Sequence, residues 1–519
     1  MNTKQLKAKV LDLAIHGKLL SPETVAELKK SPDYETADVL LEKIRKEKEE
    51  KIAKGELKRD KKDSYIFVGD DKRHYEKFAD GTVKDIEDEI PFDEPDGWAW
   101  CRLPEITEYI FAGGDKPSVF SKEKTDECFI PIYSNGIEND GLYGFTDKAT
   151  AKETSLTISA RGTIGFTCIR TTAFVPIIRL ITITPNNDYI NIHYLKAVFD
   201  SLFSFSEGSS IPQLTVPTIK QFLIPLPPFN EQKNIYSSIM KIETIIQTLE
   251  QNKNDLQISI KQTKSKILDL AIHGKLVSQD PNDEPASVLL EKLRAEKEEK
   301  IAKGELKRDK NNSFIYKGSD NCYYQRFADG HEEDISEEIP CELPESWAWC
   351  RIKDICTINP KNKLDDNLEV SFIPMSLIDA GYTNHHGQET RVWKKIKTGF
   401  THFAENDVAI AKISPCFENK KSVILKNLKN GYGAGTTELY ILRACSIVLP
   451  EYLFWIVKTD SFINEGVGNF SGVVGQQRLA RDIVENYYIP LPPINEQKRI
   501  ISKIVSLFEK LDTIENNIE

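Results

Sequence analysis

This sequence lacks the segments that mark membrane proteins and the cysteine patterns that mark zinc or disulfide proteins. Its 519 residues contain no apolar run near the ~18 residues that cross a bilayer, and the first twenty residues are too charged for a signal peptide. The nine cysteines are irregularly spaced and form no paired CxxC set, so neither a zinc ribbon nor a disulfide framework is indicated. We therefore expect a cytoplasmic protein with no membrane segment.

Motifs for nucleotide binding and group transfer are also missing. There is no GxxxxGK[ST] phosphate loop, and the cluster from Gly431 to Gly435 lacks the third glycine of a dinucleotide fingerprint. No Asn-Pro-Pro-aromatic or Asp-Pro-Pro-aromatic tetrapeptide, which amino-methyltransferases use to hold a target amine, is present. The pair His385 and His386 is isolated and more typical of a surface loop than of a metal site. We expect no catalytic, cofactor-binding or metal-binding residues, and therefore a chain that is not itself an enzyme.

What the sequence does contain is a duplication. The string LDLAIHGKL occurs at Leu11–Leu19 and Leu268–Leu276, and fifteen residues from Glu47 to Lys61 recur unchanged from Glu296 to Lys310. Further repeated strings are WAWCR (98–102 and 347–351), IPLPP (224–228 and 489–493) and NEQK (230–233 and 495–498). Between WAWCR and IPLPP the two copies are almost unrelated. A scaffold has been duplicated while the segments that it carries have diverged, which is typical of a protein that recognises two different targets.

Residues 230–273 have the apolar spacing of a coiled-coil helix. Nine of eleven positions spaced four and three apart are Ile or Leu: Ile235, Ile239, Ile242, Ile246, Leu249, Lys253, Leu256, Ile260, Thr263, Ile267 and Leu270. A core helix on a globular domain is the alternative, but it would show a wider apolar face. With Asn230 as N-cap and Gly274 as the stop, the helix would span about 65 Å at ~1.5 Å per residue.

The two chain ends repeat this helix in two pieces. Its first half corresponds to Ile500, Ile504, Leu507, Leu511, Ile514 and Ile518, and its second half to Leu6, Val10 and Leu13. We predict that these terminal segments meet end to end and form a second long helix antiparallel to the first. The chain would then be a circularly permuted tandem repeat with a pseudo-two-fold axis.

With these strings the chain resembles the specificity subunit of type I restriction–modification systems, over essentially its whole length. The resemblance rests on the IPLPP-x-NEQK and LDLAIHGKL strings and on the FADG…EIP…WAWCR segments at Phe78–Arg102 and Phe327–Arg351. Within the variable parts, Ile158–Gly165 resembles the recurrent S-x-R/K-G-x-I-G turn of the family. The segments Asp407–Asn419 and Gly433–Glu438 resemble another subtype of recognition domain.

The resemblance implies a non-catalytic subunit that reads double-stranded DNA. Two target-recognition domains would each read one half of an asymmetric, bipartite site, with the helices as a spacer of fixed length. The helices would also bind two modification subunits, which carry S-adenosylmethionine and methylate adenine N6. Two restriction subunits, which use ATP and Mg²⁺, would complete the assembly. No cofactor is expected in this chain.

The predicted fold is α+β, with two mixed α/β target-recognition domains separated by a pair of long antiparallel coiled-coil helices. The predicted parts are the N-terminal half-helix (1–20), a charged helix and hairpin lead-in (21–96), target-recognition domain 1 (97–229), the central helix (230–274), a second charged lead-in (275–345), target-recognition domain 2 (346–494) and the C-terminal half-helix (495–519). Short β-branched runs such as Thr182–Thr184 and Ser422–Leu425 indicate strands within the variable domains.

Loops of the variable domains should carry the DNA contacts. In the first domain the candidates are Ser134, Asn135, Arg161, Thr163, Ser209, Ser210 and Gln213. In the second they are Lys412, Ser414, Asn419, Thr436, Thr437, Ser471, Gln476, Gln477 and Arg478. Arginine forks suit guanine and glutamine amides suit adenine. The alternatives are a surface Arg161 paired with a carboxylate, and a solvated helix N-terminus at 476–478.

The charged segments Val39–Lys61 and Val288–Lys310 are predicted to be helices. Such charge runs are usually solvated helix faces, but the fifteen identical residues favour a repeated partner, and we hypothesise that each segment contacts one modification subunit. The strings Ala79–Gly81 and Ala328–Gly330 are predicted to turn hairpins.

Two other classes of protein remain open. The chain could be a protein-only adaptor that spaces two peptide-binding domains, or the detached DNA-reading half of a fused endonuclease–methyltransferase. The fused enzyme is disfavoured, because it would need a catalytic domain before Met1. The net charge of −11 neither requires nor excludes DNA, because phosphate binding depends on local Lys and Arg. The bases read, the spacer length and the presence of a restriction subunit do not follow from the sequence.

Overall fold

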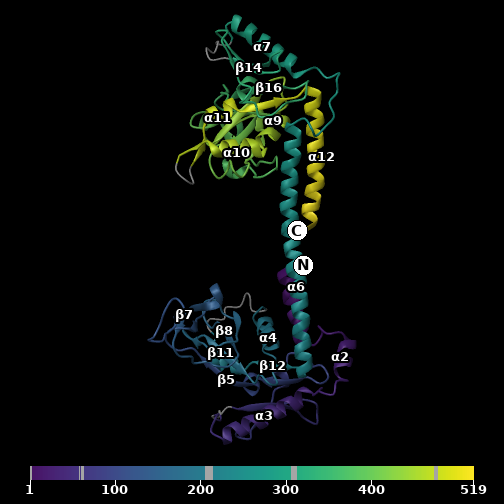
Figure 1. Ribbon diagram of the computed structural model, residues 1–519, viewed down its shortest axis with the longest axis vertical. Coiled ribbons are helices and arrows are strands. Elements are labelled where there is room, and N and C mark those ends of the chain that lie inside the picture. Colours follow the sequence, from purple (N-terminus) through teal and green to yellow (C-terminus); the bar gives the residue numbers. More distant parts are fainter. Residues whose placement is uncertain are drawn as a thin grey trace. The chain divides into compact units, whose positions relative to one another are not determined.

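The computed structural model describes residues 3–57, 59, 63–204, 214–305, 313–472 and 477–518 (Figure 1). The chain folds as two compact units, Met1–Asn252 and Lys253–Glu519. Helix α6 (Phe229–Ile272) has 44 residues and contributes its first part to unit 1 and the remainder to unit 2. It begins one residue before Asn230, so Asn230 lies in the first turn and is not the N-cap that its sequence position indicates.

Unit 1 combines helices and strands around a main core, with smaller hydrophobic clusters beside it. Its other helices are α1 (Thr3–Ile15), α2 (Pro22–Leu28), α3 (Ala37–Ala53), α4 (Ile192–Ser204) and α5 (Val216–Lys220). Its strands are β1 (Ser64–Val68), β2 (His74–Phe78), β3 (Val83–Asp85), β4 (Ala99–Arg102), β5 (Thr107–Ala112), β6 (Ile130–Tyr133), β7 (Leu142–Thr146), β8 (Ser155–Ile158), β9 (Thr167–Arg170), β10 (Val175–Pro176), β11 (Ile181–Pro185) and β12 (Leu223–Leu226). The core joins α1, α3, α4, the strands between them and the start of α6.

Unit 2 repeats this plan. Its helices are α7 (Ala286–Ala302), α8 (Ile352–Ile355), α9 (Pro450–Val457), α10 (Asp460–Gly468), α11 (Arg481–Asn486) and α12 (Ile494–Ile518). Its strands are β13 (Ser313–Lys317), β14 (Tyr323–Phe327), β15 (Glu332–Asp334), β16 (Ala348–Arg351), β17 (Cys356–Ile358), β18 (Glu369–Ile373), β19 (Glu389–Val392), β20 (Thr401–Ala404), β21 (Val408–Ala411), β22 (Ser422–Ile424), β23 (Tyr432–Gly435), β24 (Leu439–Ala444), β25 (Phe470–Ser471), β26 (Arg478–Leu479) and β27 (Tyr488–Leu491).

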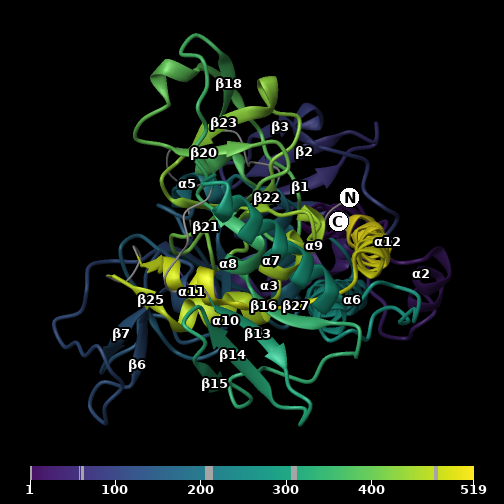
Figure 2. The same ribbon diagram turned by 90° about the horizontal axis from the view of Figure 1, so that it is seen from above.

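The two variable domains share a central antiparallel sheet although their sequences are almost unrelated. The strand order is β5-β11-β8-β9 in unit 1 and β17-β24-β21-β22 in unit 2. All five residues of β11 are buried, as expected for a β-branched run in the interior of a sheet. A second sheet differs between the units: β10-β6-β7 in the first, and β19-β18-β23-β20 in the second, where β18, β23 and β20 lie side by side (Figure 2).

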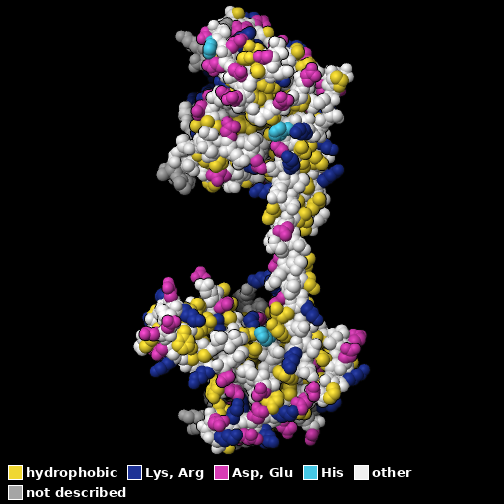
Figure 3. All heavy atoms as spheres, viewed as in Figure 1, with side chains coloured by type: hydrophobic (Ala, Val, Ile, Leu, Met, Phe, Trp, Pro, Cys, Tyr) yellow, Lys and Arg dark blue, Asp and Glu magenta, His cyan; other side chains and the backbone are white. Residues whose placement is uncertain are grey.

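Each part of α6 packs against one terminal helix. In unit 1, Val10 of α1 and Ile239 of α6 belong to the same core, and in unit 2 α12 lies beside α6 (Figure 2). The predicted seam is buried at Ile235 and Ile267, but Leu249 near its middle is 55% exposed. Hydrophobic side chains therefore remain at the surface along α6 (Figure 3).

The charged helices are shorter than the sequence pattern indicates. Helix α3 ends at Ala53 and α7 at Ala302, instead of continuing to Lys61 and Lys310. The physical reason is the glycine two residues later, which adopts the left-handed conformation at φ +77° in α3 and +73° in α7 and closes the helix end. Three-stranded sheets follow, β1-β2-β3 and β13-β14-β15, and the Ala-Asp-Gly strings form their second turns.

Candidate nucleic-acid interface

The repeated strings meet at one junction in each unit, where the variable domain joins the long helix. In unit 1, the indole nitrogen of Trp98 donates a 2.8 Å hydrogen bond to Oε2 of Glu231, and the Tyr34 hydroxyl donates to Oε1 at 3.2 Å. Glu231 is only 2% exposed. Burial raises the pKa of Glu231, and the two donated hydrogen bonds oppose that rise. The buried carboxylate therefore connects the WAWCR string to the NEQK string.

The glutamine of each NEQK string closes the same junction. In unit 1, Gln232 donates from Nε2 to the carbonyls of Pro227 (3.0 Å) and Tyr189 (3.3 Å), and accepts at Oε1 from the backbone nitrogen of Asn191 (2.8 Å). In unit 2, Gln497 makes the corresponding bonds to Pro492 (3.0 Å), Ile447 (3.0 Å) and Leu449 (2.9 Å). Both glutamines are fully buried. The string is therefore repeated for a structural reason: it ties the proline string to the start of α4 or α9.

The first and last strands of each variable domain pair with one another. Strand β4 pairs antiparallel with β12, and β16 pairs with β27. The glycine of LDLAIHGKL is required at the same junction, because Gly17 and Gly274 have φ of +65° and +64°. A Cβ atom there would lie 2.4 Å from Cγ of Pro95 or Pro344. These repeated strings form the frame that holds each variable domain.

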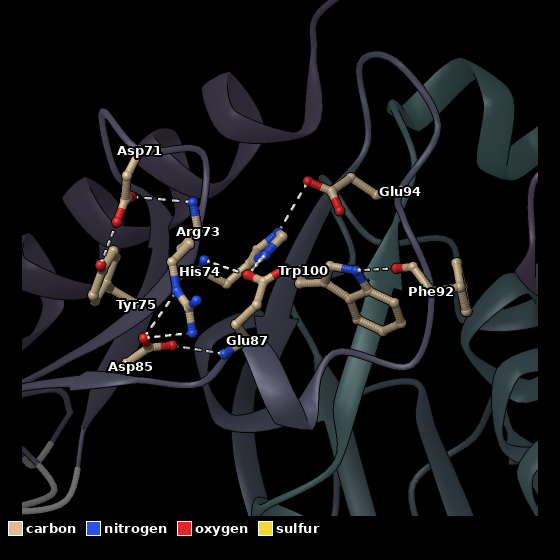
Figure 4. A network of polar contacts seen from close by, with 9 residues as sticks. All are labelled: Asp71, Arg73, His74, Tyr75, Asp85, Glu87, Phe92, Glu94 and Trp100. Carbon is tan, nitrogen blue, oxygen red and sulfur yellow. Dashed lines mark hydrogen bonds and ion pairs between the residues drawn. The ribbon is translucent and has the colours of Figure 1, made fainter.

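The lead-in sheet of unit 1 contains a buried histidine that unit 2 lacks. His74 of β2 lies between Glu87 and Glu94, with Nδ1 2.9 Å from Glu87 Oε2 and Nε2 3.1 Å from Glu94 Oε1 (Figure 4). Burial disfavours the charged imidazole, but the hydrogen bonds with both carboxylates outweigh it and raise the pKa of His74. The corresponding residue in unit 2 is Tyr323, whose backbone nitrogen donates to the Ser336 hydroxyl at 2.9 Å.

The exposed side of this sheet is held by short local contacts. Arg73 donates to Asp85 at 3.0 Å, and the Tyr75 hydroxyl donates to Asp71 at 2.7 Å (Figure 4). The indole of Trp100 donates to the carbonyl of Phe92 at 3.3 Å and fixes the lead-in to β4. These contacts hold the lead-in sheet together around His74.

In the first variable domain, Asn135 joins two loops that carry arginines. Its Nδ2 donates to the carbonyl of Ile178 and its Oδ1 accepts from the backbone nitrogen of Ala160, both at 2.7 Å. Both ends of its carboxamide are therefore engaged within the domain. Arg161 and Thr163, which closely follow Ala160, are exposed. Four of the predicted residues thus lie in one region, which Asn135 holds together: Ser134, Asn135, Arg161 and Thr163.

The sequence pattern did not indicate that Ile178 and Arg179 belong to this region. Both are exposed, and both adopt left-handed backbone conformations, with φ of 52° and 62°. Two consecutive non-glycine residues in this conformation are strained, and such strain concentrates at functional sites. The run from Ile177 to Ile183 is rich in β-branched residues and reads as one strand, which conceals the turn. Arg179 joins Arg161 as a candidate contact.

Four predicted residues, Ser209, Ser210, Gln213 and Gln476, lie outside the described residues. The described chain resumes at Leu214, whose backbone nitrogen donates to the carbonyl of Ala160 at 3.2 Å. Leu214 therefore lies beside the loop of Arg161.

In the second variable domain, most of the predicted residues come together at the ends of β21, β24 and β26. The backbone nitrogen of Ser414 donates to the carbonyl of Gln477 at 2.9 Å. The backbone nitrogen of Lys412 donates to the backbone carbonyl of Glu438 at 3.0 Å. Ser471 and Arg478 are paired between β25 and β26. Thr436 and Thr437 immediately precede Glu438, and the backbone nitrogen of Glu438 donates to the Thr436 hydroxyl at 3.2 Å.

The arginine of this cluster is held by a carboxylate. Arg478 donates to Glu438 from Nε at 3.0 Å and from Nη2 at 2.9 Å, and this pairing lowers the pKa of Glu438. Its guanidinium is thus oriented by the protein, and Glu438 becomes a further candidate contact that the sequence pattern did not single out. A carboxylate in this place suits the amino group of cytosine, and the guanidinium suits guanine.

Asn419 is not brought to this cluster. It is exposed and lines a cavity of about 640 Å³ together with Tyr382, Lys264 and Phe508, on the side of the domain that faces α6 and α12. Ser414 belongs to the cluster but is 7% exposed, so little of it is available to a ligand.

Neither a metal site nor a disulfide is found in the described part of the chain. No group of three or more His, Cys, Asp or Glu side chains there could hold a metal ion. All nine cysteines are free thiols. No helix within the described ranges combines the length and hydrophobicity needed to cross a bilayer.

Two unlike domains, each held in the same repeated frame on one long helix, define a duplicated recognition protein. The family described as "Type I restriction modification DNA specificity domain" matches residues 95–257 and 344–519, and the chain belongs to this family.

Several known proteins are similar to parts of this chain. The EcoEI specificity subunit of Escherichia coli is 41% identical over 284 residues, which are 54% of this chain and 44% of the relative. The EcoAI specificity subunit of E. coli is 43% identical over 258 residues, 49% and 41% of the two chains. The chain thus spans less than half the length of these two relatives. The crystal structure of the HsdS subunit from Thermoanaerobacter tengcongensis covers 82% of this chain and 93% of its own, with 14% identity and a TM-score of 0.41.

Proposed function

We propose that this chain is the DNA-reading specificity subunit of a type I restriction–modification complex. The observation that carries this proposal is the match of both variable domains to a DNA-specificity family, each within a frame built from the same repeated strings. Because the two domains differ in sequence and in their second sheets, they would read different half-sites of one asymmetric, bipartite sequence. The protein-only adaptor finds no support in this family.

We further propose that the long helices act as a spacer. Terminal helices α1 and α12 would be the halves of one helix that lies antiparallel to α6 as a coiled coil, so that the chain is a circularly permuted tandem repeat. In unit 2, Lys264 pairs with Asp512 while the later Gln279 bonds the earlier Glu496, an order that supports antiparallel packing; in unit 1, Lys7 of α1 pairs with Glu250 of α6. Half-sites on one face of B-DNA are separated by multiples of about 34–36 Å, so a helix of fixed length would set the spacer.

The chemistry would belong to partner subunits. Two modification subunits would supply S-adenosylmethionine and methylate adenine N6, and restriction subunits would supply ATP- and Mg²⁺-dependent cleavage. This chain would hold no cofactor and contribute no catalytic residue. Its own side chains would contact base edges or phosphates, with exposed Arg161 and Arg179 in the first domain and the pair of Arg478 and Glu438 in the second. The cytoplasmic location remains a prediction.

Sequencing of adenine methylation in cells with and without the gene tests the proposal. We expect one asymmetric bipartite motif to be methylated only when the gene is present. Exchange of residues 97–229 for the same region of a relative should change one half of the motif and leave the other half intact. An identical methylation pattern with and without the gene, in cells that produce the modification subunit, would overturn the proposal.

A further inference from the structure

The charged helices α3 and α7 are nearly identical, and their buried residues explain part of that identity. Leu40 and Leu41 of α3 lie in the core, as do Leu289 and Leu290 of α7. The glycine that follows each helix is required by its left-handed conformation. These positions are constrained by folding alone and carry no information about partners.

The exposed residues at the ends of the two helices are identical as well, and folding does not explain them. They are Glu50, Ala53, Lys54 and Glu56 in unit 1, with Glu299, Ala302, Lys303 and Glu305 in unit 2, and all eight are exposed. We call these eight residues the repeat surface. Substitutions at exposed positions usually change stability by less than about 0.5 kcal/mol, so folding leaves such residues free to vary.

Exposed positions elsewhere in the same duplicated region have indeed diverged. Within the helices, exposed Lys46 of α3 corresponds to exposed Ala295 of α7. In the sheets that follow, exposed Val68 corresponds to Lys317, and exposed Lys72 corresponds to Asn321. The duplication is therefore old enough for exposed residues to have changed, and the unbroken identity at one end of each helix needs another cause.

Two neighbouring residues are identical although their contacts within the chain are not. In unit 1, Lys51 donates to Glu108 at 2.5 Å, but the residue corresponding to Glu108 in unit 2 is Thr357. The corresponding lysine, Lys300, is exposed. The Tyr189 hydroxyl donates to Glu47 at 2.6 Å in unit 1, whereas the corresponding Glu296 is exposed. Contacts within one unit therefore do not account for the identity either.

A cavity lies along the charged helix in both units, and in unit 1 it includes Glu56 of the repeat surface. In unit 1 it has a volume of about 660 Å³ and is lined by Ile52, Glu56, Tyr65 and Phe78, among others. In unit 2 the corresponding cavity is about 320 Å³, includes Phe314 and Phe327, and extends to Glu298, the residue before the repeat surface. An arginine of the charged helix covers one ring in each: Arg45 lies 4.5 Å from the ring centre of Tyr65, and Arg294 lies 4.0 Å from that of Phe314. Each cavity offers apolar surface to a side chain of a bound protein.

We propose that the repeat surface, together with the cavity along the same helix, docks a modification subunit, one at each copy; this rests on the function proposed above. The exposed glutamates disfavour a nucleic acid, because they would repel its phosphates. Their carboxylates, with one lysine in each copy, instead suit a protein surface of mixed charge with basic side chains opposite the glutamates. Helix α3 packs against the short 3₁₀ helix Leu103–Ile106 at the base of the first variable domain. A subunit docked there would lie beside the domain that reads its half-site.

The test uses the full chain produced together with its modification subunit. One variant carries Glu50→Arg and Ala53→Arg, a second carries Glu299→Arg and Ala302→Arg, and a third carries all four. Because these positions are exposed, unfolding temperatures should match the wild type. Native mass spectrometry should show two modification subunits on the wild type, one on each double variant and none on the quadruple variant. The affinity of each altered site should fall at least tenfold.

The matched control is Lys46→Ala, which converts an exposed residue of α3 into the residue present at that position in α7. We expect this variant to bind two modification subunits with wild-type affinity. If the quadruple variant also retains two subunits and the complex still methylates its bipartite motif, the docking surface is wrong and the proposed function stands. If the wild-type chain binds no modification subunit and directs no methylation, the proposed function itself fails.

Discussion

Lys264 of α6 donates a 2.5 Å hydrogen bond from Nζ to Oδ1 of Asp512 in α12. A second bond of 3.1 Å runs from the same ammonium to Glu515. Burial disfavours the charged lysine, but the hydrogen bonds to both carboxylates outweigh it and raise the pKa of Lys264. Gln279, beyond the end of α6, donates to Glu496 near the start of α12 at 2.7 Å. The register of the two helices is therefore set by polar contacts as well as by the apolar seam.

Insertion of one heptad after Lys253, with a matching insertion at the chain terminus, should lengthen the helix pair without changing its seam. Seven residues add about 10 Å at ~1.5 Å per residue, so the preferred spacer of the DNA site should become longer. The two half-sites should remain the same, because the variable domains are untouched. Methylation protection of sites with graded spacers measures this. An unchanged spacer preference would show that the helices do not set the distance.

Removal of the buried carboxylate at the junction should destabilise unit 1. Glu231→Ala leaves the donors of Trp98 and Tyr34 without their acceptor, which typically costs about 1–3 kcal/mol. Urea-induced unfolding of the full chain measures the change in the free energy of unfolding. Gln247→Ala, at an exposed position of the same helix, is the control and should stay within about 0.5 kcal/mol of the wild type. Equal midpoints for both variants would contradict a structural role for Glu231.

The stability of unit 1 should depend on the protonation of His74. Its folded pKa is raised, so the charged imidazole stabilises the fold below the unfolded value of about 6.5, and this contribution is lost as pH rises through the folded pKa. The unfolding temperature of the wild type should therefore fall relative to that of His74→Gln as pH rises from about 6 to about 8.5. Unit 2 has Tyr323 at this position and should show no corresponding change. If the unfolding temperatures of the wild type and of His74→Gln change with pH in the same way, the prediction is wrong.

Substitution of Arg161, or of Asn135, which holds the loop of Arg161, should affect one half-site only. If Arg161 reads a base, Arg161→Ala should relax one position of one half-site at a cost of about 1–3 kcal/mol. Asn135→Ala should weaken discrimination in the same half-site, because it releases the loops of Arg161 and Arg179 from one another. Methylation of a randomised site library by the assembled complex measures both effects, with exposed Lys152→Ala as the control. Equal weakening on every sequence would identify Arg161 as a phosphate contact instead.

The long helix α6 could be predicted from the sequence almost to the residue, because its period depends on local spacing. The predicted 44-residue helix has 44 residues and is displaced by one. The ends of α3 and α7 differ from the prediction. In α3, the charged residues favour a helix as far as Lys61, but the left-handed conformation of Gly55 ends the helix earlier, and the equivalent glycine does the same in α7. Glycine is permitted in a helix, so its presence alone did not mark the stop.

The candidate contact residues stay predictions, and the sequence does not show how distant loops bring them together. Asn135 is one of these candidates, and in the structure its carboxamide bonds to Ala160 and Ile178 within the domain. The sequence pattern does not point to the two further candidates: the neighbours of Arg179 resemble a strand, and Glu438 is neither an arginine nor a glutamine, the types that best suit guanine and adenine. Trp98 and Glu231 both lie in or beside repeated strings, yet nothing in the sequence pairs two residues separated by 133 positions.

The pairing of β4 with β12, and of β16 with β27, places the two ends of each variable domain next to one another. A domain attached in this way is replaceable as a cassette, since any segment with the same flanking strings can close the same ladder. The flanks are nearly alike in the two halves of the gene, so recombination between them could exchange one cassette for another. A new target specificity would then arise in a single genetic event, without any change in the rest of the protein.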